Sequence, residues 1–139
     1  MAYSYGQVEI TLGSAQSFTT TGDKLTWGGQ TIPWYVRRVA IAITTAPTVQ
    51  TGIINFTTRG TVGSNAGIVA GDIAILNLLT TYIAGQVIYK DPQEKLLKPG
   101  QEMVVNVGQN PTAGAGNVNI LVEPSYETPL NNTNMVLTT

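Results

Sequence analysis

The fold is decided between Ile83 and Pro124, where the chain reads IAGQVIYKDPQEKLLKPGQEMVVNVGQNPTAGAGNVNILVEP. Three runs of this segment place apolar residues two apart, as strands with one apolar face do. They are Gln86–Tyr89, Glu102–Val107 and Asn117–Val122. A Pro99-Gly100 turn precedes the second run, and no catalytic or ligand motif interrupts the segment. The segment therefore predicts packed β-strands and not an active site.

Three details of this segment make narrower predictions. Val87 and Tyr89 form the apolar face of the first run. Gly114-Ala115-Gly116 predicts a hairpin turn before the third run, because the following helix and the Lys-Ser/Thr pair of a phosphate-binding loop are missing. Glu123-Pro124 marks the exit from the last strand, where we expect the core to end.

Further strand-like runs precede this segment. They are Tyr3–Leu12, Lys24–Trp27, Tyr35–Thr45, Ile53–Thr58 and Asp72–Leu79. Tyr35–Thr45 and Ile53–Thr58 are predicted to pair as an antiparallel hairpin. Asp72–Leu79 fits a helical face as well as a strand, and its short length favours the strand.

The connections between these runs are predicted from turn-forming residues. Gly13–Gly22, Ala46–Gly52 and Arg59–Ala70 are rich in such residues and are expected to be loops, the first of them alternatively an edge strand. About eight strands without a convincing helix indicate an all-β fold, an antiparallel β-sandwich that is jelly-roll-like. An immunoglobulin-type sandwich is less well supported.

The length of 139 residues predicts one domain. We expect residues 1–124 to form a single β-sandwich and residues 125–139 to form a C-terminal tail or arm that packs on the surface or on a neighbouring chain. Charged residues make up 11% of the chain, against about 25% in ordinary soluble proteins. Thr, Asn, Gly and Gln take their place, which favours β-structure.

The missing residue types exclude several kinds of chemistry. The chain has no cysteine and no histidine, so thiolate metal sites, disulfides and Ser-His or Cys-His nucleophiles are impossible. The net charge of −1, without a basic cluster, indicates no nucleic-acid partner. Neither an export signal nor an uninterrupted apolar run of membrane-spanning length is visible. We therefore expect no cofactor, no metal and no membrane partner, and synthesis in the cytoplasm.

Two groups of residues are candidates for contact with a partner or a glycan. Trp27, Trp34 and Tyr35 flank the Gly28-Gly29 turn and could form an aromatic platform for sugar, or pack in the core or an interface. The tail supplies the second group. Its members are Tyr126, Asn131, Asn132 and Met135.

Paired acids are the remaining candidates for catalysis or cation binding. Asp91 with Glu94 lies beside lysines, which is typical of a solvated loop, and Glu123 with Glu127 lacks the Asp/Asn spacing of a calcium loop. We therefore assign neither a catalytic residue nor a metal ligand.

The C-terminal part of the chain resembles small head-decoration, or other head-associated, proteins of tailed bacteriophages. The stretches that carry the resemblance are Ala84–Asp91 (AGQVIYKD), Lys98–Val105 (KPGQEMVV), Leu121–Pro124 (LVEP) and Pro129–Asn132 (PLNN). None of them is a binding motif, so the resemblance assigns no site residue.

Such a resemblance implies a non-enzymatic structural protein of the virion. Decoration proteins, or cement proteins, sit on the outer capsid surface, commonly as homotrimers, and reinforce it by contact. The implied partners are copies of the same chain and the major capsid protein. The alternative is a carbohydrate-binding or receptor-binding β-sandwich, and a hydrolase that uses paired acids is the third reading.

Overall fold

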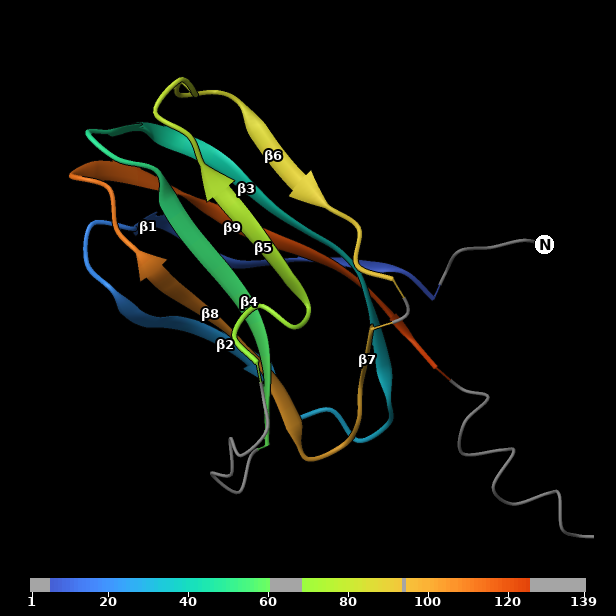
Figure 1. Ribbon diagram of the computed structural model, residues 1–139. Helices are drawn as coiled ribbons and strands as arrows, with labels where there is room; N and C mark the ends of the chain where they lie inside the picture. Colours follow the sequence, from blue (N-terminus) through green and yellow to red (C-terminus); the bar gives the residue numbers. More distant parts are fainter. Residues whose placement is uncertain (1–5, 61–68, 94, 126–139) are drawn as a thin grey trace, which may run out of the picture.

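The computed structural model describes residues 6–60, 69–93 and 95–125, and the regular elements in these ranges are all β-strands (Figure 1). The strands are β1 (Val8–Ser17), β2 (Gly22–Gly28), β3 (Trp34–Thr48), β4 (Gly52–Gly60), β5 (Ala74–Leu78), β6 (Val87–Lys90), β7 (Lys95–Leu97), β8 (Gln101–Gln109) and β9 (Ala113–Pro124). The predicted strands are therefore confirmed wherever the structure describes them. The short strand β7 was not predicted.

The strands form two antiparallel sheets that pack face to face (Figure 1). One sheet has the order β1-β9-β3-β6. The short strand β7 pairs with the first residues of β3, Trp34–Val36, on the same edge of β3 as β6. The other has the order β2-β8-β4-β5. The predicted β-sandwich is confirmed.

The pairing follows the path of one long hairpin folded over on itself. β1 pairs with β9, β2 with β8, β3 with β6 and β7, and β4 with β5. The first half of the chain thus meets the second half in reverse order. This connectivity is that of a jelly roll.

The core lies between the sheets and is built from alternate residues of the central strands. Val118, Ile120 and Val122 of β9 are buried, while the residues between them are half-buried. Ile54 and Phe56 of β4 face them from the other sheet and are fully buried. Each such side chain contributes roughly 1.5–3 kcal/mol by leaving water.

The predicted hairpin between Tyr35–Thr45 and Ile53–Thr58 is wrong. These residues belong to β3 and β4, which lie in different sheets and share no pairing. The connection bends from one sheet to the other at Val49, whose φ is 75°. Because the chain changes sheets there, both strands find partners far away in the sequence.

All three predicted loops are partly strand. β1 continues to Ser17 and β3 to Thr48, and both extensions pair with β9 through register shifts. β4 continues to Gly60 and so includes Arg59, whereas residues 61–68 of the third predicted loop lie outside the described residues. Gly114–Gly116 is likewise part of β9 and not a hairpin turn. Pairing of the backbone satisfies the peptide groups of these stretches although their side chains are polar or small.

The apolar face expected for the first run of the deciding segment is on the outside. Val87 and Tyr89 pair with Ala42 and Ala40 and are 59% and 57% exposed. Ile88, between them, packs against the core instead. A short edge strand needs only one core-facing side chain, so the spacing of its apolar residues did not reveal its orientation.

Candidate functional site

Trp27 and Trp34 form an edge-to-face pair at one end of the sandwich. Their ring centroids are 5.9 Å apart and their planes meet at 84°. Both rings are partly buried and pack against the core, Trp27 from β2 and Trp34 from β3. The structure thus brings these two predicted residues together, with their rings turned to the interior.

Tyr35 lies on the other face of β3, away from the tryptophans. The Arg37 guanidinium carbon is 4.4 Å from the centre of its ring, and Arg37 Nε donates a hydrogen bond of 3.0 Å to Glu123 Oε1 on β9. Since successive residues of a strand point to opposite faces, Trp34 and Tyr35 cannot share one flat platform.

A β-bulge places two arginines on the outer face of the same sheet. The register of β3 against β9 shifts between Val36 and Arg38. Val36 and Val39 are both buried although three residues separate them along the numbering, so Arg37 and Arg38 both point outward. The spacing of three between buried valines is the signal by which the sequence could have revealed the bulge.

Arg38 is held by β6 and the residue after it. Its Nε and Nη2 donate to the two carboxylate oxygens of Asp91 at 2.6 and 3.0 Å, and its guanidinium carbon is 4.1 Å from the centre of the Tyr89 ring. The hydrogen bonds from Arg38 lower the pKa of Asp91, and the same bonds raise the pKa of Arg38. The pair therefore stays charged over the ordinary pH range.

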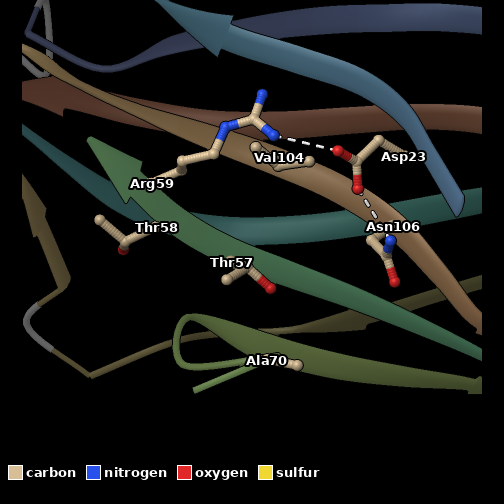
Figure 2. A pocket seen from close by; sticks show the side chains of 7 residues that line it. All are labelled: Asp23, Thr57, Thr58, Arg59, Ala70, Val104 and Asn106. Carbon is tan, nitrogen blue, oxygen red and sulfur yellow. Dashed lines mark hydrogen bonds and ion pairs between the residues drawn. The ribbon is translucent and has the colours of Figure 1, made fainter. Parts of the chain in front are cut away.

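A shallow hollow of about 230 Å³ lies on the outer face of the second sheet (Figure 2). Asp23 of β2 and Arg59 of β4 reach toward each other across β8, where Val104 and Asn106 lie (Figure 2). The remaining lining residues are Thr57, Thr58 and Ala70.

Charged hydrogen bonds organise this hollow. Arg59 Nη1 donates to Asp23 Oδ2 at 3.0 Å, and Arg59 Nε and Nη2 lie 2.8 and 2.7 Å from Glu102 Oε2. Asn106 Nδ2 donates to Asp23 Oδ1 at 2.8 Å. Thr58 Oγ1 is buried and has no hydrogen-bond partner in the described ranges. Thr58 pairs with the core residue Met103, so this hydroxyl points to the interior and not into the hollow.

The sequence did not single out this hollow. Arg59, Asp23 and Asn106 come from three strands that are distant in the chain and adjacent in the sheet. Alternation in β4 does predict that Asn55 and Thr57 point outward, but the strand order is needed to know what they face.

The acids of the described ranges are mostly occupied by basic side chains. Asp91 and Glu123 pair with arginines, and Lys95 Nζ lies 3.1 Å from Asp72 Oδ2. Glu94 and Glu127, the acids predicted to pair with Asp91 and Glu123, lie outside the described residues. Within residues 6–60, 69–93 and 95–125, no group of three or more Asp or Glu side chains is arranged to hold a metal ion.

Exposed apolar side chains flank the two edge strands on one side of the sandwich, Ile75 on the outer face of the second sheet and Val87 and Tyr89 on that of the first. We call this side the β5–β6 side, and its exposed apolar residues are Ile75, Leu79, Ile83, Val87 and Tyr89. β5 and β6 are the edge strands of the two sheets, residues 73–89 contain no charged side chain, and β6 carries one charge, Lys90, at its end. Natural proteins usually protect such edges with charges, so edges with so few of them mark a contact surface.

The predicted tail residues Tyr126, Asn131, Asn132 and Met135 lie outside the described residues, as does Tyr3–Tyr5 of the first predicted strand. No helix long and apolar enough to cross a membrane occurs in the described part of the chain. Comparison with family models, curated proteins and solved structures gives no match to this chain.

Proposed function

We propose that this chain is a non-enzymatic structural protein of a virion, which self-associates, with a trimer favoured, and binds the major capsid protein on the outer capsid surface. The observation that carries the proposal is the β5–β6 side. Five large apolar side chains are 38–63% exposed there, on two edge strands and the loop that joins them. An apolar edge of this kind is stabilised by burial against another protein surface.

Two further observations support a role in contact and not in chemistry. The ion pairs of Arg37, Arg38 and Arg59 tie neighbouring strands together, which stiffens the outer faces of both sheets. The low charge of the chain allows close packing of identical copies, since little charge must be desolvated. The resemblance of the C-terminal part to phage head-decoration proteins points in the same direction.

The mechanism would be linkage between binding and assembly. A protein that binds only the assembled shell stabilises that shell by mass action. Each bound copy would bury apolar area on the β5–β6 side or on the surfaces next to it. No group needs to gain or lose a proton for this function.

Light scattering after size exclusion and co-sedimentation with capsids of the encoding phage test the proposal. We expect a defined oligomer that sediments with capsids. Ile83→Glu should weaken association, because it places a charge within the β5–β6 side. Val49→Glu is the matched control, since Val49 is 80% exposed outside the β5–β6 side. A monomer that does not sediment with capsids would refute the proposal.

A second candidate function is carbohydrate or receptor binding, favoured by the hollow around Arg59. Carboxylate, amide and guanidinium groups of Asp23, Asn106 and Arg59 converge there, as in a site for a polyhydroxylated ligand. Jelly rolls occur in both capsid and lectin domains, so the fold alone does not choose. Glycan-array binding that is lost in Asp23→Ala and kept in Trp34→Phe would support this candidate, and an array without signal would remove it.

A further inference from the structure

We propose that the β5–β6 side is covered by the C-terminal segment, residues 128–139, of a second copy of the chain, which adds to the edge as an extended strand. This inference rests on the proposed self-association and names the element that produces it. An extended segment that joins an open sheet edge gains main-chain hydrogen bonds, and pockets for alternate side chains provide specificity.

The two sides of the sandwich differ in charge. The edge strands on the other side, β1 and β2, carry Glu9, Asp23 and Lys24. On this side β5 carries no charged residue, and β6 carries one, Lys90, at its last position. Because charges at an edge hinder pairing with another chain, the β5–β6 side is better suited to accept an added strand than the β1–β2 side.

The C-terminal segment matches this side in character. Residues 128–139 read TPLNNTNMVLTT and contain no charged residue, and Met135-Val136-Leu137 is its most apolar stretch. An edge with exposed valine, isoleucine and tyrosine and little charge favours an uncharged, apolar strand over a charged one, which would lose hydration.

The direction in which β9 ends favours a second copy over the same chain. β9 is antiparallel to β3 and reaches Pro124 opposite Trp34, at the end of β3 where β7 pairs. β6 pairs further along, at Val39–Ala42. β9 therefore leaves the sandwich beyond β7 and directed away from β6 (Figure 1).

The segment is long enough to reach a neighbouring copy. The residues after Ser125 number 14 and span up to about 45 Å when extended, whereas a four-stranded sheet is about 15 Å wide between its outer strands. To cover its own β6, the segment would have to turn back across β3 and past the Arg37 and Arg38 ion pairs.

Shortening the chain tests whether the segment covers this side. A variant that ends at Glu127 should show faster amide hydrogen exchange over residues 75–89 than the full chain, and a lower oligomeric mass. Exchange across β1 and β2 is the internal control and should not change. Unchanged exchange over 75–89 would overturn the inference.

Cysteine crosslinking tests which chain supplies the segment. The sequence contains no native cysteine that could form competing disulfides. Val87→Cys is mixed with each of a set of single-cysteine variants at positions 130–137 and oxidised. We expect a disulfide-linked heterodimer for positions near Met135. The matched control Thr26→Cys, exposed on β2, should give none.

Three results would overturn the inference. The first is the absence of a heterodimer at every position, and the second is preferential linkage of Val87→Cys to itself. The third is linkage only within single chains in a variant that carries Val87→Cys and Met135→Cys together. If the variant that ends at Glu127 keeps its oligomeric mass and its capsid binding, this inference fails while the proposed function stands. If the unmodified full chain does not bind capsids, that result would instead count against the proposed function.

Discussion

Arg38 donates two hydrogen bonds to the Asp91 carboxylate, of 2.6 Å from Nε and 3.0 Å from Nη2, while its guanidinium lies over the ring of Tyr89. This contact joins β3 to the chain just after β6 on the outer face of the sheet. It depends on the bulge that turns Arg38 outward, so one irregularity in β3 determines how β6 is held.

The Arg38–Asp91 pair should make stability depend on acid. The pKa of Asp91 in the folded protein is lowered below its ordinary value of 3.8, so its contribution is complete above that value and is lost as the pH falls through the folded pKa. Urea midpoints of the native chain and Asp91→Asn should therefore differ near neutral pH and converge once the pH falls below the lowered pKa of Asp91 in the folded protein. Arg38→Gln should remove the same pH dependence, and a constant difference down to low pH would contradict the assignment.

Arg59 should stabilise the second sheet because it bridges two acids. Its side chain is 27% exposed and contacts both Asp23 and Glu102. Arg59→Met should leave the acids without a counter-charge and lower the free energy of unfolding by about 1–2 kcal/mol. Arg59→Lys should recover only part of this, since an ammonium group lacks the planar fork. Urea denaturation measures both, and equal stability of the three proteins would disprove the bridge.

The tryptophan pair should be coupled in stability. In a cycle of Trp27→Leu, Trp34→Leu and the double variant, we expect a coupling energy of about 0.5–1.5 kcal/mol from the edge-to-face contact. Tyr35→Leu serves as the control partner for Trp27, because Tyr35 lies on the opposite face of β3. Additive effects for Trp27 and Trp34 would show that the contact is not energetically significant.

Gly116 should resist substitution because β9 lies very close to β3 there. A Cβ at this position would lie 2.7 Å from the Ala42 carbonyl oxygen and 2.8 Å from Ile41 Cγ2. Gly116→Ala should cost about 1–3 kcal/mol in thermal or urea unfolding. Gly6→Ala is the control, since its Cβ would be 3.5 Å from the nearest atom, Glu123 Cγ. Similar stability of the two variants would contradict the close approach.

The strand positions were predictable where alternation is strong. Val39, Ile41 and Ile43 in β3 and Ile54 and Phe56 in β4 face the core as their spacing predicts. The Asp72–Leu79 segment likewise forms a strand with Ala74, Leu76 and Leu78 inward.

Polar strand extensions and edges were not predictable in the same way. β1 runs on through Gly13–Ser17 because β9 offers backbone partners there, and side-chain pattern carries no information about backbone partners. Val87 and Tyr89 have core-like spacing but face outward, because only the neighbouring strand determines which side of β6 is inside.

The sequence by itself determined that this chain is an all-β sandwich without the side chains for thiol, imidazole or disulfide chemistry, since alternation and composition are local properties. Tertiary structure alone decided which strands are neighbours. It therefore decided that β3 and β4 lie in different sheets, that Arg59 contacts Asp23, and that β5 and β6 form two open edges on one side. The reason is physical: pairing across a jelly roll joins residues far apart in the chain, and no local pattern encodes which of many compatible edges will meet.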